Sequence, residues 1–484
     1  PYHLFSITKI HLAAHSPSQL IGSSTQKMDA VAILDVCWIT PDSNSPEFYM
    51  PITYLDAVWL RLPTSKLLFS YHLADPTQTH FNSVIVPRLK HSLSLTLTHF
   101  FPLAGNVVWP SHDPIPSILY RPNDCVSLTI AESNNPESFV HLAGKKPYKA
   151  TESHFYIPEL HATDSESAIV SVQATLFANH GVAIGLNINH AVFDANTFSL
   201  FLKAWAHMNK QLSADSSPLL PPELTPFLDR SGVQDPEGLC MKILKLWEEL
   251  MPSASGRSIM SSRPSDPDPT LVRATFEVSL DDVKKLRDLA LSKLGISDAK
   301  TQRLSTFVLV YSYTLDCLVK AKKLESLEMV KCLIMAESRN HLNPPLPHNY
   351  LGNCLTLSST YITGELVREK DGFAGIAKLI NEHIQEVRNK SVYQVFKDDI
   401  PVASPPGNGK VLYVCPGSPR IELYEIDFGW GKPVKVELTN TGRFAAFIAE
   451  RGDGSGGVEI TLVMTADEME VFDSLFVGGL KNKA

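Results

Sequence analysis

The sequence predicts an α/β protein with two similar halves, each holding a mixed sheet, joined by a long crossover. With 484 residues, of which 44% are hydrophobic and 19% charged, the chain can bury two sizeable cores. Strand and helix patterns alternate over residues 28–211 and again over 271–484. Between them, residues 212–270 are rich in Pro and Ser around one helical stretch, 236–250. We therefore expect two α/β domains that face each other across a channel, with residues 212–270 crossing between them.

In the first half, three segments carry clear periodicities. The first convincing strand directly follows Met28. Residues 83–100 predict a helix, because four apolar side chains share one helical face: Ile85, Leu89, Leu93 and Leu97. Residues 181–189 alternate strictly, which predicts a strand with one apolar face: Val182, Ile184, Leu186 and Ile188.

The second half carries three similar signals. Residues 278–291 predict a helix with Ser279 as its N-cap. Residues 304–321 predict a buried helix or a strand, because Val, Tyr and Thr leave the segment ambiguous. Residues 458–476 predict a strand followed by an amphipathic helix that closes the fold.

Residues 1–27 do not match either half. They contain no acidic side chain and are rich in Ser, Thr and His. A transit peptide would be rich in Arg, and a secretory signal would have a cleaner apolar core. We expect a disordered extension here, with a targeting role as the alternative.

Charge and cysteine usage exclude several classes of protein. The net charge of −8 and the pI near 6.1 disfavour a nucleic-acid surface, which requires a basic patch. No apolar run reaches the roughly 18 residues that a membrane helix needs. The seven cysteines are scattered singly without a CxxC pair, which disfavours a zinc site and a disulfide framework. We expect a cytoplasmic protein with no metal.

The best candidate for chemistry is the segment Asn189-His190-Ala191-Val192-Phe193-Asp194. It follows the alternating strand and precedes a helical pattern, so His190 is predicted at a strand-to-helix turn, where a side chain can face a cleft. An imidazole is well matched to taking a hydroxyl proton at neutral pH. The alternative interpretation is a loop histidine followed by an aspartate that caps a helix.

A second motif is Asp427-Phe428-Gly429-Trp430-Gly431, which follows the strand-like residues 421–426. Two glycines around an aromatic residue predict a tight turn that passes close to another element. A kinase interpretation fails, because neither a Gly-rich loop nor an HRD motif accompanies the sequence. The motif by itself therefore favours a structural role.

Together, HxxxD at residues 190–194 and DFGWG at 427–431 resemble the BAHD family of plant acyltransferases. The resemblance spans nearly all of residues 28–480 and includes PITYLDAVWLRLPTSKLLFSY (51–71), LTHFFPLAGNVVWP (97–110), FLDRSGVQDPEGL (227–239), AESRNHLNPPLPHNYLGNC (336–354) and GSPRIELYEIDFGWGKPVKVE (417–437). NYLGNC is similar to the YFGNC signature of the anthocyanin and flavonoid-glucoside clade.

The resemblance implies a monomer of two chloramphenicol-acetyltransferase-like domains, with the active-site channel between them. It implies direct transfer of an acyl group from a coenzyme A thioester to a hydroxyl, with His190 as general base and no bound cofactor. Asp194 would turn away from the substrates and pair with an arginine, for which Arg339 is the candidate. The DFGWG residues would be structural: Asp427, Gly429, Trp430 and Gly431.

Three positions depart from the family pattern. Ala195 stands where HxxxD is usually followed by Gly, and would cost about 1 kcal/mol if the position required φ > 0. Leu351 replaces the Phe of YFGNC, and His341 replaces the second Arg of an RxR motif. None of these is the base, so we expect effects on loop shape and specificity.

The donor and the acceptor stay open at this point. The resemblance favours malonyl-CoA as donor and a sugar hydroxyl of a phenolic, flavonoid or anthocyanin glucoside as acceptor; a hydroxycinnamoyl thioester is the alternative donor. A malonyl carboxylate needs a cationic partner, for which the available candidates are Lys203, His341, Arg420 and Lys432. A non-catalytic binding protein of the same fold is a further alternative, which the intact His190 and Asp194 disfavour.

Cys354, in NYLGNC, is the alternative nucleophile. A thiolate requires an activating base or a positive charge, and the neighbours Leu351 and Leu355 offer neither. We therefore expect no covalent acyl-enzyme.

Overall fold

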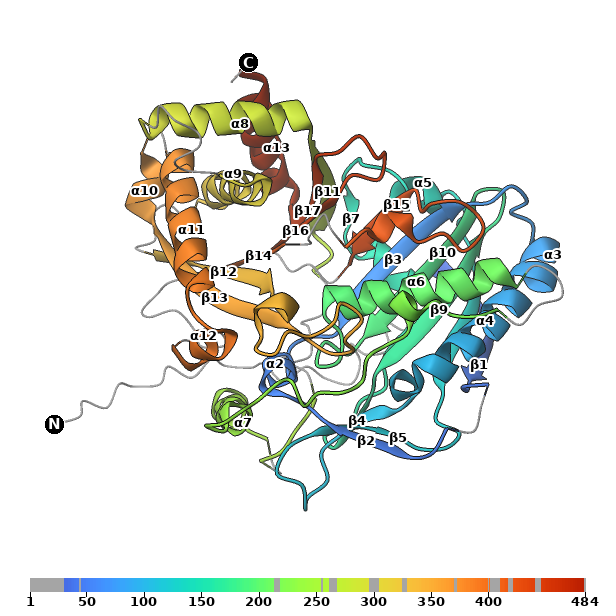
Figure 1. Ribbon diagram of the computed structural model, residues 1–484. Coiled ribbons are helices and arrows are strands. Elements are labelled where there is room, and N and C mark those ends of the chain that lie inside the picture. The colour runs from blue at the N-terminus through green and yellow to red at the C-terminus, as the bar shows by residue number, and fades with distance from the viewer. Residues whose placement is uncertain are drawn as a thin grey trace.

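The computed structural model shows two α/β halves packed against each other, which confirms the predicted fold class (Figure 1). It describes residues 30–42, 45–212, 218–253, 256–260, 268–295, 304–323, 329–369, 372–398, 400, 410–416, 421–439 and 445–482. The expected extension, residues 1–27, lies outside these ranges. Within them, no helix combines the length and the apolar character required to cross a membrane.

The first half is built on a six-stranded sheet in the order β1-β6-β9-β10-β3-β15. The strands are β1 (Val31–Ile39), β6 (Val126–Ser133), β9 (Val170–Phe177), β10 (Gly181–Ile188), β3 (Ser65–His72) and β15 (Lys435–Leu438). All neighbours are antiparallel except β6 and β9, which run parallel. Helices α4 (Val86–His99) and α6 (Ala195–Gln211) lie side by side over this sheet (Figure 1).

Smaller elements complete the first half. A four-stranded antiparallel sheet has the order β2-β5-β4-β8, formed by Phe48–Pro51, Ser117–Tyr120, Asn106–Val108 and Glu166–Ala168. The short helices are α2 (Tyr54–Ala57), α3 (Gln78–His80), α5 (Ser138–Leu142), the π-helix η1 (Phe81–Ile85), and the 3-10 helices η2 (Phe101–Ala104) and η3 (Glu152–Tyr156).

The second half is built on a seven-stranded sheet in the order β13-β12-β14-β16-β17-β11-β7. The strands are β13 (Leu355–Thr363), β12 (Met329–Glu337), β14 (Lys410–Pro416), β16 (Ala445–Glu450), β17 (Val458–Thr465), β11 (Leu271–Val278) and β7 (Tyr148–Lys149). The accompanying helices are α8 (Leu280–Lys293), α9 (Thr306–Ala321), α10 (Gly364–Arg368), α11 (Gly372–Arg388), α12 (Val392–Asp398), α13 (Ala466–Asn482), and the 3-10 helices η5 (Arg339–His341) and η6 (Leu423–Glu425).

Each large sheet takes one strand from the other half of the chain. β15 pairs with β3 at the edge of the first sheet, and β7 pairs with β11 at the edge of the second. The two halves therefore share main-chain hydrogen bonds in addition to side-chain contacts.

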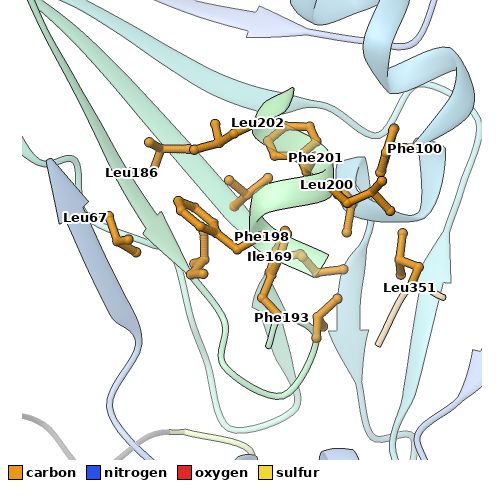
Figure 2. Close-up of a cluster of buried hydrophobic side chains, with 14 of the residues drawn as sticks. Leu67, Phe100, Ile169, Leu186, Phe193, Phe198, Leu200, Phe201, Leu202 and Leu351 are labelled. Carbon is orange, nitrogen blue, oxygen red and sulfur yellow. The ribbon is translucent and has the colours of Figure 1, made fainter. Parts of the chain in front are cut away.

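The apolar cores follow the same arrangement. One core fills the first half and extends to residues 346–357 and 421–449 of the second. Figure 2 shows its central part, where Phe198, Phe201 and Leu202 of α6 pack with Leu186 of β10, and where Leu351 joins from the second half. A separate core lies between the second sheet and its helices α8, α9, α11 and α13.

Most of the expected elements are present. The helix predicted over residues 83–100 is present as α4, preceded by the end of the π-helix η1, which includes Ile85. Residues 458–476 lie in β17 and α13, and the ambiguous segment 304–321 contains the helix α9. Residues 278–291 contain α8, whose N-cap is Ser279 in a capping box with Asp282. Local periodicity predicted α4, α8 and α13 because each buries one apolar face, whereas α9 is buried on nearly all sides and its pattern was therefore ambiguous.

Of two expectations about strands, one is confirmed and one is wrong. The strand predicted over residues 181–189 is β10, and it is buried on both faces because residues 152–157 cover the face that carries its small residues. A Cβ at Gly185 would lie 2.0 Å from the carbonyl oxygen of Tyr156, so this position requires Gly. Residues 421–426 are not a strand: they contain the 3-10 helix η6, entered through Glu422 with φ of 56°.

The segment 212–270 connects α6 of the first half to β11 of the second. It holds α7 (Leu239–Leu250), where residues 236–250 predicted a helix, and a short 3-10 helix η4 (Pro222–Leu224). α7 packs on α2, and Trp247 Nε1 donates to the carbonyl of Ala57 at 2.9 Å. Before α7, Phe227 pairs in a parallel bridge with Tyr350 of the second half.

Candidate active site

His190 lies in the turn from β10 to α6, and Asn189 fixes this turn. The N–H of Asn189 donates to the carbonyl of Ile169 (2.8 Å), and its side-chain oxygen accepts from the N–H of Ala191 (3.0 Å). The Asn189 amide nitrogen donates to Ser167 Oγ at 3.1 Å. His190 is consequently held at the end of the strand, partly exposed, while the following residues are buried.

The His190 ring stacks on the indole of Trp59, with ring centroids 4.0 Å apart and planes 6° apart. Nδ1 is buried, which leaves Nε2 as the nitrogen that can exchange a proton with a substrate. Burial lowers the pKa of His190 to about 4, although main-chain groups of His190 and Phe193 and the charge of Asp194 act in the opposite direction. The imidazole is therefore neutral at pH 7, the state in which it can accept a proton.

Asp194 points away from the imidazole and into the protein. Its Oδ1 caps α6 by accepting from the N–H of Thr197 at 2.8 Å. Arg339 donates to both carboxylate oxygens, at 2.8 and 3.1 Å, and the N–H of Cys354 donates to Oδ2 at 2.9 Å. Both side chains of the ion pair are fully buried. Ala195 is the first residue of α6 with a helical backbone, so the missing Gly causes no strain there.

Arg339, the partner that the resemblance implied, also holds the segment 350–354. From η5, its guanidinium donates to the carbonyls of Tyr350 (3.2 Å) and Gly352 (3.1 Å). The hydroxyl of Thr197 accepts from the N–H of Gly352 at 3.2 Å and donates to its carbonyl at 2.9 Å. One buried charge thus joins α6 of the first half to a loop of the second.

A second buried ion pair lies beside the first. Arg230 donates to Asp56 Oδ2 at 2.6 Å; Asp56 is fully buried, and 9% of the Arg230 side chain is exposed. Asp56 Oδ1 accepts from the main-chain N–H of Asn353 (3.0 Å) and from its side-chain amide (3.1 Å). The same amide donates to the carbonyl of His190 at 3.0 Å.

Cys354 does not have the surroundings of a nucleophile. Its side chain is buried, and burial raises its pKa above the usual range, opposed by Arg339 and assisted by Asp194. A thiol at neutral pH reacts poorly. Its N–H serves the structure instead, by donating to Asp194.

The DFGWG turn lies at the far end of α6. Asp427 Oδ1 accepts from the N–H groups of Gly429 (2.7 Å) and Gly431 (2.9 Å), both of which have φ above 90°. Lys210 pairs with Asp427 Oδ2 at 2.6 Å, and Trp430 stacks on Phe428. Although burial opposes it, the Lys210 charge and these amides lower the pKa of Asp427. Lys210 is 16 positions after Asp194, or about 24 Å along the helix.

Two of the candidate cations for a malonyl carboxylate are paired with glutamates. Lys203 pairs with Glu422 at 2.9 Å, and Lys432 pairs with Glu425 at 2.5 Å. His341 is exposed at the end of η5, and Arg420 lies outside the described residues.

His190 does not line either of two cavities in the described part of the chain. One, of about 270 Å³, is formed by residues 422–432 and 450–457; the other, of about 420 Å³, by residues 48–54 and 228–240 with Ile115. A substrate channel at His190 therefore stays a prediction.

Neither spacing nor composition directly indicated four further residues around His190: Asp56, Trp59, Arg230 and Asn353. They lie in the stretches that carry the family resemblance, but Asp56 and Arg230 are 174 positions apart. A lone Asp within the apolar run YLDAVWL was the available signal, because a buried carboxylate needs a partner.

Comparisons with known proteins point to one family and one fold. A family model described as the Transferase family matches residues 30–477. The chain is 38% identical to a malonyl-CoA:anthocyanidin 5-O-glucoside-6''-O-malonyltransferase of Arabidopsis thaliana, over 93% of this chain and 99% of that protein. It is 36% identical to phenolic glucoside malonyltransferase 1 of the same plant, over 94% and 98%. Among solved structures it resembles vinorine synthase in fold, with a TM-score of 0.66 and 21% identity over 93% of this chain and 98% of that one.

Proposed function

This chain belongs to the Transferase family, the BAHD acyltransferases, and from that premise we propose that it moves a malonyl group from malonyl-CoA to a sugar hydroxyl of a phenolic or anthocyanin glucoside. The observation that carries the proposal is His190. It is partly exposed at a strand end, its pKa is lowered to about 4, and Asp194 is engaged elsewhere. A neutral imidazole with one nitrogen available is what proton abstraction from a hydroxyl requires.

In the proposed reaction, Nε2 of His190 takes the proton of the acceptor hydroxyl as its oxygen attacks the thioester carbonyl. The tetrahedral intermediate collapses by breaking the carbon–sulfur bond, which forms the ester and releases the coenzyme A thiolate. The imidazolium returns its proton to that thiolate, so the enzyme ends as it began. Holding both substrates in one geometry supplies much of the rate.

Direct attack is supported by the environment of Cys354, whose thiol is buried and protonated. Both substrates must then bind before either product leaves. We expect initial-rate lines at varied donor and acceptor to intersect. Parallel lines, or an acyl adduct on Cys354 found by mass spectrometry, would contradict direct transfer.

The donor follows the relatives, two of which are named as malonyltransferases. The test is a mixture of malonyl-CoA and hydroxycinnamoyl-CoA, offered with phenolic and anthocyanin glucosides and read by mass spectrometry. We expect the glucoside acceptor to gain one malonyl group from malonyl-CoA. A hydroxycinnamoyl product would assign the other donor, and no product with any pair would favour a binding protein of the same fold.

We propose that the protein acts in the cytosol as a monomer. The six cysteines whose side chains are described are free thiols, as in a reducing compartment. Fractionation of the source tissue and light scattering of the purified protein test the two statements separately.

A further inference from the structure

The side chain of Asn353 occupies an unusual position for a buried amide. It is fully buried in the second half of the chain, yet both of its side-chain hydrogen bonds go to the first half. One goes to the carboxylate of Asp56 and the other to the main-chain carbonyl of His190. Both partners only accept hydrogen bonds, so the position requires an NH₂ group, which Asp, Ser or an apolar residue cannot supply in full.

Asp56 holds both sides of the His190 turn. Through Asn353 it fixes the main chain of His190. The main-chain carbonyl of Asp56 also accepts from the main-chain N–H of Trp59 at 3.0 Å, at the end of the short helix α2. The Trp59 ring in turn covers the imidazole, with ring centroids 4.0 Å apart. Arg230 contacts the Asp56 carboxylate at 2.6 Å, which gives this buried side chain a cationic partner.

Two successive main-chain N–H groups, those of Asn353 and Cys354, each donate to a different buried carboxylate. The N–H of Asn353 donates to Asp56 and the N–H of Cys354 donates to Asp194. β13 of the second sheet begins at the next residue, Leu355. These two adjacent main-chain N–H groups therefore fix the position at which the second half of the chain contacts the His190 turn.

We propose that Asn353 is a positioning residue for acyl transfer: it fixes the His190 main chain, and Asp56 fixes Asn353 and Trp59 together. This inference rests on the proposed function of His190. The side-chain oxygen of Asn353 is buried without a hydrogen-bond partner. A buried polar atom without a partner has a cost, and the two hydrogen bonds that the Asn353 amide nitrogen donates, to Asp56 and to the His190 carbonyl, account for keeping an amide here.

The experiment compares Asn353→Ala with the matched control Asn209→Ala. Asn209 is also a buried asparagine whose amide donates to a carbonyl, that of Phe428, at 2.6 Å, but it lies at the other end of α6. We expect Asn353→Ala to lower kcat about 10- to 100-fold with little change in KM, because displacement of a reacting group by 1 Å has effects of that order. Asn209→Ala should lower the melting temperature and leave kcat unchanged.

The pH profile separates positioning from stability. Without Asn353, the His190 turn loosens and water reaches the imidazole, so the acidic limb of kcat/KM should move up toward the usual histidine range. Asn209→Ala should leave the limb in place. Asn353→Ser keeps one donor and should recover part of kcat.

Each outcome decides the inference. An Asn353→Ala protein with the wild-type kcat and limb overturns it while the proposed function stands. If Asn353→Ala and Asn353→Ser both fail to fold by circular dichroism, Asn353 is structural and the inference is also overturned. A wild-type protein that transfers no acyl group overturns the proposed function first, which the same assay reveals.

Discussion

Two histidines of this chain share a depressed pKa and lie in different surroundings. Burial lowers the pKa of both His190 and His154 to about 4. Each lies near an arginine–carboxylate pair. Asp194–Arg339, near His190, joins the two halves of the chain, and Arg273–Glu437, near His154, joins the two large sheets through β11 and β15. His154 donates through Nε2 to the carbonyl of Thr439 at 3.3 Å, whereas the buried Nδ1 of His190 has no hydrogen-bond partner and its Nε2 is the nitrogen that we propose contacts the substrate.

A low histidine pKa therefore reports burial and does not by itself report catalysis. Around His154, the ion pair and Tyr148 join strands: Glu437 on β15 meets Arg273 on β11 and Tyr148 on β7. Around His190, the ion pairs hold loops and leave the ring at a strand end. The same kind of ion pair connects strands of two sheets near His154 and holds the loops around the proposed base near His190.

Removing each imidazole should give the largest contrast. We expect His190→Ala to lower kcat/KM by about 10²- to 10⁴-fold, because the general base is lost. His154→Ala should retain activity per folded molecule. Steady-state rates with thermal melts check this. Comparable losses in both variants, or a His190→Ala protein that melts far below the wild type, would return His190 to the role of a core histidine.

The two ion pairs should behave alike in stability and differently in activity. Asp194→Asn removes one of the two carboxylates that contact the buried Arg339, the other being Glu337, and Glu437→Gln removes the carboxylate that contacts the buried Arg273. Each variant should lose about 3–5 kcal/mol of unfolding free energy, because a buried charge loses its ionised partner. Only Asp194→Asn should also lower kcat of the folded fraction, because Asp194 shapes the His190 turn. Denaturant unfolding and rate assays on the same preparations test the pair; equal kcat losses would erase the distinction.

The pH dependence of catalysis should follow His190 alone. A general base works when neutral, so kcat/KM should rise with pH through the free-enzyme pKa of His190, well below 6.5 and toward 4. A hydroxyl of the acceptor ionises far above this range. His154→Leu should keep the same acidic limb. If the limb shifted in that variant, His154 and not His190 would be the group that titrates in it.

The pH dependence of stability should involve both histidines. Their folded-state pKa is below the unfolded value of about 6.5, so the unfolded chain binds more protons between pH 6.5 and 4. Stability is therefore retained above 6.5 and lost as pH falls through this window. His154→Leu should flatten that fall, measured by denaturant unfolding at several pH values. An unchanged slope would mean that His154 is not buried as described.

A substitution in the DFGWG turn should have the smallest effect and, like substitution of His154, should change stability without changing activity. Gly429 has φ of 97°, where a Cβ is strained, so Gly429→Ala should lose about 1–2 kcal/mol of stability. Because the turn lies about 24 Å from Asp194 along α6, kcat should be unchanged. A variant with normal stability and reduced kcat would place the turn in the catalytic machinery.

The elements that sequence periodicity predicted correctly are those whose burial is decided by their own neighbours. α4, α8 and α13 each show an apolar face over three or more turns, and Ser279 caps α8 as expected. Residues 421–426 have a strand-like composition, but Glu422 with φ of 56° and η6 interrupt them. The small residues of β10 face residues 152–157, a contact that no local pattern contains.

At the candidate site, the strand-to-helix turn followed from spacing, and Arg339 followed from the family resemblance. Trp59 over the imidazole did not follow from either, because an aromatic residue in an apolar run is usually core. Asp56, Arg230 and Asn353 are united by hydrogen bonds between positions 174 and 297 apart.

By itself, then, the sequence determined the two α/β halves, the His190 turn and the cap of α6 by Asp194, since these depend on side chains within a few positions of each other. Only the tertiary structure decided that β7 and β15 exchange sheets, that Asn353 reaches the His190 carbonyl, and that Trp59 covers the ring. The physical reason is that a buried charge or amide takes whichever partner the chain path brings beside it. That path is set by the packing of both halves together.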